Sequence, residues 1–122
     1  MMNSKFLRLI CYILGFLTIA LWLHKSAHAE TGIASVYSYG HGTPRHSLTA
    51  CGVRFDPGAM AAAHRKLPCD SLVRVRHGHH SAIVRITDRG PFRKGRIIDL
   101  TPAAARAVGL PGLGIVTVEN LR

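Results

Sequence analysis

The sequence lacks an apolar run long enough to cross a membrane. The uncharged segment 9–23 holds only fifteen residues, and a membrane-spanning helix needs roughly 20. This excludes an integral membrane protein, apart from an N-terminal anchor that is not removed. Residues 1–29 also lack any acid but contain Lys5, Arg8 and Lys25. Together with the small-x-small sequence at 27–29, this pattern predicts a secretory signal peptide over residues 1–29.

The rest of the chain has too few residues for two domains. Residues 30–122 number 93, which is enough for one small core, and they contain no repeat or low-complexity tract. A multi-lobed enzyme and a separate cofactor-binding domain are therefore excluded, and we expect no cofactor. We expect a single domain that is periplasmic or secreted, soluble after signal cleavage, and monomeric.

Acidic residues are scarce throughout the chain. Six Asp and Glu stand against 16 Lys and Arg, and 13 basic residues remain once residues 1–29 are removed. This balance favours anionic polymers as partners: wall glycan with its carboxylates, teichoic or lipid phosphates, or nucleic acid. The alternative is a basic surface that has no ligand.

Cysteine is equally sparse. Cys51 and Cys69 are the two that follow the predicted signal peptide, and an exported protein meets an oxidising environment. An even pair suggests one disulfide, which would close a loop of nearly twenty residues and contribute about 3 kcal/mol. Two free thiols or a redox pair are the alternative, but the sequence has no CxxC spacing to support them.

The pattern of apolar residues and turn signals predicts a mainly β domain. Alternation and turn residues predict strands at 32–38, 72–76, 82–87, 96–100 and 114–120, with a long loop at 39–49. Two short helices are expected, one at 58–64 after an Asp-Pro start signal and one from Thr101-Pro102 to Val108. Five or six short strands in so short a chain favour a small closed barrel.

Four segments resemble the double-psi β-barrel domain of the rare lipoprotein A family, the septal-ring lytic transglycosylases of bacteria. The matching segments, in the family's order, are GIASVY at 32–37, TACGVRFDP at 49–57, AAAHRKLPCDSLVRVR at 61–76 and VRITDRGPFRKGRIIDLTPAAARAVGL at 84–110. The resemblance implies a small six-stranded double-psi β-barrel with two short helices. It also implies a periplasmic protein that cleaves peptidoglycan glycan strands, with a preference for strands stripped of stem peptides.

A lytic transglycosylase cleaves the bond between N-acetylmuramic acid and N-acetylglucosamine without water, and the muramyl 6-hydroxyl closes a 1,6-anhydro ring. The reaction needs an acid for the leaving oxygen and a base for the 6-hydroxyl proton. In the family, one acidic position associated with activity matches Asp88. The other, a Glu, is Val53 in this chain, which predicts weakened or absent activity. Asp56 and Asp70 are nearby substitutes, although a helix cap and a turn are the expected roles of these two residues.

The residues near Asp88 are the other candidates for a site. The resemblance implies a role for His64 in proton transfer or sugar binding; the alternative is a residue that stabilises a helix C-terminus. Asp88 itself could instead be a turn residue, and pairing with Arg85 or Arg89 would lower its pKa. We expect Asp99 to hold backbone in the barrel. Arg89, Phe92 and Tyr37 are candidate substrate-binding residues, and barrel packing is the alternative for the two aromatic side chains.

A histidine cluster invites a metal interpretation. Three histidines surround Gly78 between residues 77 and 80. A single hairpin tip cannot easily direct three imidazoles at one ion, so we expect a solvated turn and no metal site.

The resulting hypothesis is a peptidoglycan lytic transglycosylase whose partner is the glycan strand. A catalytically silent, expansin-like barrel that binds glycan is the alternative that Val53 favours. Nucleic-acid binding conflicts with the export signal, and a secreted inhibitor or effector that uses the same barrel is a further alternative.

Overall fold

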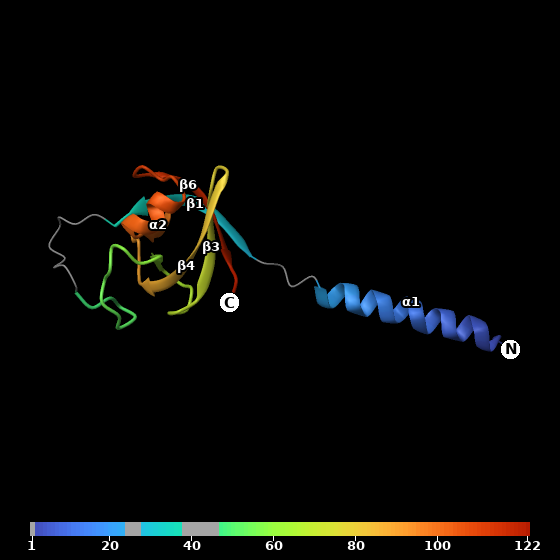
Figure 1. Ribbon diagram of the computed structural model, residues 1–122. Coiled ribbons are helices and arrows are strands. Elements are labelled where there is room, and N and C mark those ends of the chain that lie inside the picture. The colour runs from blue at the N-terminus through green and yellow to red at the C-terminus, as the bar shows by residue number, and fades with distance from the viewer. Residues whose placement is uncertain (1, 24–27, 38–46) are drawn as a thin grey trace.

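Six strands close into a barrel in the computed structural model, which describes residues 2–23, 28–37 and 47–122 (Figure 1). The strands are β1 (Ala29–Val36), β2 (Ala61–His64), β3 (Leu72–His77), β4 (His80–Asp88), β5 (Arg96–Leu100) and β6 (Gly114–Asn120). Their order around the barrel is β1-β5-β2-β4-β3-β6. The pairs β1–β5 and β2–β4 are parallel, and the other neighbours are antiparallel. The predicted fold class, a mainly β six-stranded double-psi barrel, is confirmed.

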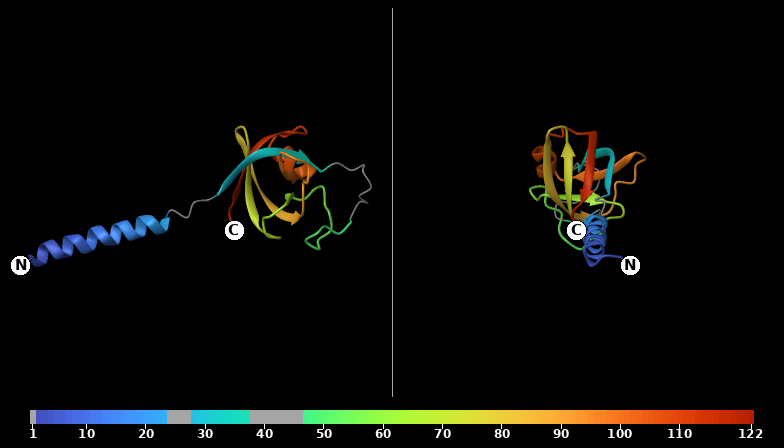
Figure 2. Two further views of the ribbon diagram at one scale, coloured as in Figure 1. Left: turned by 180° about the vertical axis from the view of Figure 1, so that it is seen from behind. Right: turned by 90° about the vertical axis from the view of Figure 1, so that its right-hand side faces the viewer.

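Alternating side chains fill the barrel. In β3, Val73 and Val75 are fully buried, whereas Arg74 and Arg76 between and after them face outward. The strands and the residue after α2 together build one core, whose largest fully buried members are Val73, Val75, Val84, Ile86, Ile98, Leu100, Val108, Val116 and Val118. Figure 2 shows the barrel from behind and from the side.

One end of the barrel is covered by helix α2 (Pro102–Ala107), which the sequence predicted within one residue of its end. Thr101 is the N-cap: its hydroxyl accepts from the Ala104 N–H at 3.2 Å and donates to the carbonyl oxygen of Ala59. Gly109 follows the helix at φ +67°, the conformation that favours glycine after a helix. The capping residue therefore also ties α2 to the segment before β2.

The predicted helix at 58–64 is wrong, because residues 61–64 form strand β2. The Asp56 carboxylate accepts from the Gly58 N–H at 2.8 Å and so closes a local turn instead of capping a helix. Alanine favours helices, but four residues are too few for a stable helix without packing. β2 instead pairs on both sides, with β4 and β5, and all four of its residues are buried. Within the described residues 28–37 and 47–122, α2 is thus the only helix.

Other boundaries differ by a few residues. β1 begins three residues earlier than predicted, and the β3–β4 turn is shorter, since His77 and His80 are already paired. Most of the loop predicted at 39–49, including Tyr39, lies outside the described residues. Ser4–Leu23 form helix α1, which Figure 1 shows apart from the barrel. No helix in the described part of the chain has the length and apolar character that a membrane crossing requires.

Cys51 and Cys69 form a disulfide, as the even count predicted. Their Cα atoms are 5.6 Å apart and 18 positions separate them in sequence. The bond joins the loop that precedes β2 to the turn between β2 and β3.

Replacing both cysteines by serine should lower the free energy of unfolding by about 2–5 kcal/mol, because the unfolded chain regains the entropy of an open loop. Urea unfolding of the oxidised native protein and of the double variant measures the difference. An unchanged unfolding midpoint would contradict the stabilising role of the bond, and the reduced native protein should match the variant.

Candidate functional site

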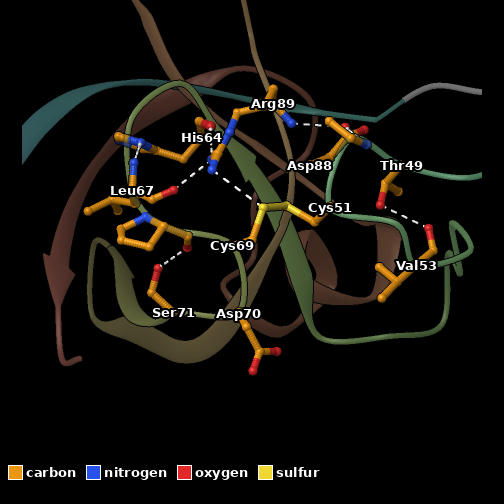
Figure 3. Close-up of a disulfide and its surroundings, with 12 residues drawn as sticks. Thr49, Cys51, Val53, His64, Leu67, Cys69, Asp70, Ser71, Asp88 and Arg89 are labelled. Atoms are coloured by element: carbon orange, nitrogen blue, oxygen red, sulfur yellow. Dashed lines mark hydrogen bonds between the residues drawn. A yellow bond between two sulfur atoms is a disulfide. The ribbon is translucent and has the colours of Figure 1, made fainter.

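Asp88 ends β4 and accepts three hydrogen bonds, of which Figure 3 shows the one from the Arg89 backbone. Its Oδ1 accepts from the backbone N–H of Ala50 at 2.9 Å and of Arg89 at 2.8 Å. Its Oδ2 accepts from the Tyr37 hydroxyl at 3.1 Å. Three donors converge on two oxygens, a set that suits an ionised carboxylate, which can only accept. Asp88 is therefore more than a turn residue, because it joins β4, β1 and the disulfide loop.

Tyr37, directly after β1, supports Asp88 from one side. Its ring stacks on Phe55 with a centroid distance of 4.6 Å. Burial, with the negative charge and hydrogen bond of Asp88, raises the pKa of Tyr37 to about 12. The hydroxyl consequently stays protonated and keeps donating to Asp88 at neutral pH.

Asp99, on β5, is a second carboxyl at the same site. Burial raises its pKa above the ordinary value, and the charge of Asp88 adds to the rise; a hydrogen bond from Ser35 and the charge of Arg96 oppose it. The Ser35 hydroxyl donates to Asp99 Oδ1 at 3.2 Å. A carboxyl with a raised pKa holds its proton longer and is suited to proton donation.

Strand register places the two carboxyls on one face. Ala63 of β2 pairs with Asp88 on one side and with Asp99 on the other. Side chains of directly paired residues point to the same face of a sheet. Two strand spacings separate their Cα atoms, up to about 10 Å.

Two register shifts help to bring about this alignment. The β2–β4 pairing skips one residue between Ala62 and Ala63, so that Ala63 meets Asp88 rather than Thr87. The β1–β5 pairing shifts between Ile33 and Ala34, which brings Ser35 opposite Asp99. An extra residue in one strand reverses which face the following side chains occupy. Both carboxyl positions thus depend on these irregularities.

Neither Arg85 nor Arg89 makes an ion pair with Asp88. Arg85 binds Asp70 Oδ1 at 2.7 Å instead. The Arg89 guanidinium donates to the carbonyl oxygens of His64 and Leu67, at 3.0 and 2.6 Å, and lies 3.4 Å from the Cys69 sulfur. Arg89 thereby organises the turn after β2 (Figure 3). These bonds use three of its five N–H donors, so its role in substrate binding stays a prediction.

His64 ends β2 and is buried, not placed at a helix C-terminus. Its Nδ1 accepts from the backbone N–H groups of Lys66 and Leu67 at 3.1 and 3.0 Å. The proton must then lie on Nε2, which donates to Glu30 Oε2 at 3.0 Å. Both ring nitrogens have partners within the fold. The geometry thus gives His64 a positioning role in the turn to which Arg89 also binds, and its predicted part in proton transfer remains a prediction.

Phe92 and Val53 both have exposed side chains on loops. Phe92 follows the cis Gly90–Pro91 bond and is 78% exposed, with its ring against Gly90. An exposed aromatic ring four residues after Asp88 can stack on a sugar, whereas barrel packing is not its role. Val53 is 46% exposed, and its carbonyl oxygen accepts from the N–H and the hydroxyl of Thr49. Figure 3 shows it on the disulfide loop, apart from Asp88.

The remaining candidates lie in local turns. Asp70 has φ +73° and, in Figure 3, points away from Asp88, which agrees with the turn role expected for it. His77 Nδ1 donates to the carbonyl oxygen of Val108, so this histidine belongs to the contact between the hairpin and α2. Among the described residues, no group of three His, Cys, Asp or Glu side chains is arranged to hold a metal ion.

The sequence alone did not place Asp99 near Asp88, although the charge of Asp88 acts on it in the structure. The sequence shows a strand aspartate before a helix cap, for which a structural role is the ordinary expectation. The register that places Asp99 opposite Ala63 depends on a long-range pairing with β2, which was itself predicted as helix. The one available signal was an acidic residue in the otherwise apolar segment 97–100.

Comparisons with known proteins agree with the fold and the matched segments. The profile of the family described as lytic transglycolase matches residues 29–120. A probable endolytic peptidoglycan transglycosylase RlpA from Nostoc is 52% identical over 91 residues, which cover 72% of this chain and 24% of that protein. An endolytic peptidoglycan transglycosylase RlpA from Pasteurella multocida is 47% identical over 101 residues, 80% of this chain and 33% of that protein. The chain thus spans about a quarter to a third of these curated relatives.

Solved structures share the fold at lower identity. The Clavibacter michiganensis expansin has a TM-score of 0.61 and 21% identity, covering 78% of this chain and 51% of that one. A Streptomyces papain inhibitor has a TM-score of 0.60 and 23% identity, covering 78% of this chain and 96% of that one. At such identities the likeness concerns the architecture of the barrel alone.

Proposed function

Because the chain belongs to the lytic transglycolase family, we propose that it cleaves the glycan strands of peptidoglycan and leaves 1,6-anhydro-muramyl ends. The observation that carries this proposal is the pair of carboxyls, Asp88 and Asp99, on one face of the barrel and on either side of Ala63. The names of the two relatives above support the same reaction class and substrate.

In the proposed reaction, Asp99 is the acid. Its raised pKa means that it keeps its proton to a higher pH than an ordinary aspartic acid, and the protonated carboxyl can give that proton to the glycosidic oxygen as the bond to the muramyl anomeric carbon breaks. The leaving sugar departs with that proton as a neutral alcohol. The Ser35 hydroxyl donates to Asp99 Oδ1, which leaves Oδ2 as the oxygen that holds the proton.

Asp88 is the base in this proposal. The muramyl 6-hydroxyl attacks its own anomeric carbon, a new C–O bond closes the 1,6-anhydro ring, and the hydroxyl proton passes to Asp88. Before that transfer, the negative charge of Asp88 also stabilises the positive charge that develops on the sugar ring. The donors from Tyr37, Ala50 and Arg89 fix the orientation of the carboxylate.

The other predicted site residues support this pair. Phe92 offers an exposed ring for stacking on a sugar next to Asp88. Tyr37 acts through Asp88, which its hydroxyl contacts. His64 and Arg89 hold the turn that faces the disulfide, and the two remaining donors of Arg89 are suited to a glycan oxygen.

Mass spectrometry tests the proposal directly. The protein without residues 1–29 is incubated with purified glycan strands, and soluble fragments are analysed. We expect fragments that end in 1,6-anhydro-muramic acid, which are lighter by one water than hydrolysis products. Fragments with reducing muramic acid ends, or no fragments from folded protein, would contradict the proposed reaction.

A second candidate is a barrel that binds glycan without cleaving it. The observation that favours it is Val53, a residue unable to transfer a proton, at the position of the family's Glu. One solved relative of the fold is an expansin in complex with cellohexaose, with a TM-score of 0.61 and 20% identity. Glycan that co-sediments with the protein while releasing no fragment would select this candidate.

Val53→Glu should raise product formation by about tenfold. An added carboxyl supplies a second proton donor, but at a half-exposed position its pKa is not raised by burial, so the gain stays below the usual range of general acid catalysis. The exposed position should also leave the melting temperature unchanged. Val53→Gln, with a side chain of matched size and no acid, is the control. Equal rates for native, Glu and Gln proteins would show that the chain's own carboxyls suffice.

We also propose that residues 1–29 are an export signal and that residues 30–122 are the mature domain in the periplasm or outside the cell. β1 begins at Ala29, so cleavage after this residue would remove only the first residue of β1 and nothing from the other five strands.

A further inference from the structure

Ser35 is a buried hydroxyl in contact with the proposed acid. It lies on β1 and is 5% exposed, and the other buried polar side chains of the described chain are His64, Ser71 and Thr101. The hydroxyls of Ser71 and Thr101 donate to backbone carbonyl oxygens. The Ser35 hydroxyl instead donates to the side chain of Asp99. This contact therefore couples a buried donor to a group that gains and loses a proton.

The strand register fixes this contact. Ser35 pairs directly with Asp99 on the parallel strands β1 and β5, after the register shift between Ile33 and Ala34. Its Oγ atom lies 3.2 Å from Asp99 Oδ1. Both strands belong to the closed barrel, so neither partner sits on a loop. The hydroxyl thus holds the Asp99 carboxyl in one orientation.

Ser35 also acts on the charge of Asp99. Burial raises the pKa of this carboxyl, and the hydrogen bond from Ser35 is the strongest effect that lowers it, followed by the positive charge of Arg96. The negative charge of Asp88 adds to the rise. The charge of Asp99 in turn helps to raise the pKa of Tyr37, whose hydroxyl donates to Asp88. Among these groups, Ser35 is the neutral one that stabilises the ionised form of Asp99.

Such a hydrogen bond helps a buried acid to release its proton. Burial alone would make the Asp99 carboxyl hold its proton too firmly, since a general acid works best with a pKa near the operating pH. Negative charge grows on the carboxyl as the proton leaves, and a hydrogen bond to a charged acceptor is roughly twice as strong as a neutral one. The contact with Ser35 therefore strengthens during proton transfer, which lowers the barrier.

We infer that Ser35 is a positioning residue for the proposed acid, and that its hydroxyl sets the upper pH limit of glycan cleavage. This inference rests on the proposed function, because it takes Asp99 as the proton donor. Ser35 acts through Asp99 and needs no contact with the glycan. Loss of the hydroxyl should consequently change the rate of cleavage and its pH dependence more than the binding of the strand.

Three variants of the full-length protein test this role. Ser35→Ala removes the hydroxyl, and Ser35→Thr keeps it on a side chain that suits a strand. Ser71→Ala is the matched control, because it deletes another buried hydroxyl, one that donates to the carbonyl oxygen of Pro68. The titration midpoint of Asp99 is measured by NMR of its carboxyl carbon, whose resonance is assigned from its loss in Asp99→Asn. The pH profile of anhydro-muramyl product formation is measured in parallel.

In Ser35→Ala, we expect the Asp99 midpoint to rise by roughly one pH unit, because the ionised form loses a hydrogen bond to its charge. The fall of turnover at high pH should move in the same direction by a similar amount. Maximal turnover should drop about tenfold with KM unchanged, since the missing donor acts on proton transfer and not on binding. Ser35→Thr and Ser71→Ala should keep the native midpoint and profile.

Equal Asp99 midpoints in the native protein and in Ser35→Ala would overturn the inference, as would a Ser35→Thr protein that titrates like Ser35→Ala, or a control that shifts as much. If Ser35→Ala does not fold, Ser35→Cys takes its place, because it keeps the shape of the side chain with only a weak S–H donor, and its midpoint should also rise. The titration needs no substrate. Native protein that forms no anhydro products would refute the proposed reaction, whereas equal midpoints in an active protein would refute the role of Ser35 alone.

Discussion

Asp88→Asn should lower turnover on peptidoglycan glycan by roughly 10²–10⁴, the range that general acid–base catalysis supplies. Asparagine keeps the size of the side chain, and its carbonyl oxygen can still accept from the Ala50 and Arg89 N–H groups. The Tyr37 hydroxyl can rotate and accept from the new amide. The substitution therefore removes the basicity and the negative charge of the side chain, while the asparagine can replace each hydrogen bond that Asp88 makes.

The measurement is the rate of anhydro-muramyl product formation together with the melting temperature. Asp70→Asn is the matched control, because it makes the same chemical change at a turn whose side chain points away from Asp88 (Figure 3). We expect it to keep native turnover. A folded Asp88→Asn protein with native turnover would remove Asp88 from the mechanism, and an unfolded one would assign it a structural role only.

Asp99→Asn should also lower turnover by roughly 10²–10⁴. Unlike turnover, however, the stability of the folded protein should rise in this variant. The folded-state pKa of Asp99 lies above its unfolded value, because burial disfavours the charged form. Its contribution to stability is therefore present below the unfolded pKa near 3.8 and is lost as pH rises through the folded pKa. Asparagine never ionises, so above that pH the variant should melt at a higher temperature than the native protein.

The pH profile provides a second readout. If Asp99 is the acid, native turnover falls as pH rises through its pKa, and the residual activity of Asp99→Asn lacks that fall. Glu119→Gln, which removes a carboxylate paired with Arg74, is the control and should leave the profile unchanged. If turnover of Asp99→Asn still falls at high pH as it does in the native protein, another group donates the proton.

Local signals in the sequence predicted most of the barrel. The alternation in 72–76 and 82–87, the Thr101-Pro102 start and the Gly109 stop depend on neighbours in the chain, and the structure confirms them within a few residues. β2 could not be predicted in this way. Its four residues resemble a helix by composition, and they become a strand only because β4 and β5 supply hydrogen bonds on both sides.

The same distinction applies to the candidate site. Asp88 was found through a specific local motif, and the disulfide through the cysteine count. Contacts between distant segments determine the rest of the site. They set the register shift that directs the Asp88 side chain, the alignment of Asp99, and the hydrogen bonds from Arg89 to backbone carbonyl oxygens. Local patterns specify which side chains are present, whereas long-range pairing decides which of them meet.

The disulfide helps to hold two of the segments that contact Asp88 and Arg89. Ala50, which donates to Asp88, directly precedes Cys51, and Cys69 lies against Arg89, the residue after Asp88. The sulfur bridge and the Ala50 N–H join the start of that loop to the barrel, and Phe55 further along it stacks on Tyr37. With both thiols reduced, one of the three donors to Asp88 would lie on a loop that has lost its covalent link to the turn between β2 and β3. Under the proposed function and export, an oxidising environment would then complete the site by closing this bond.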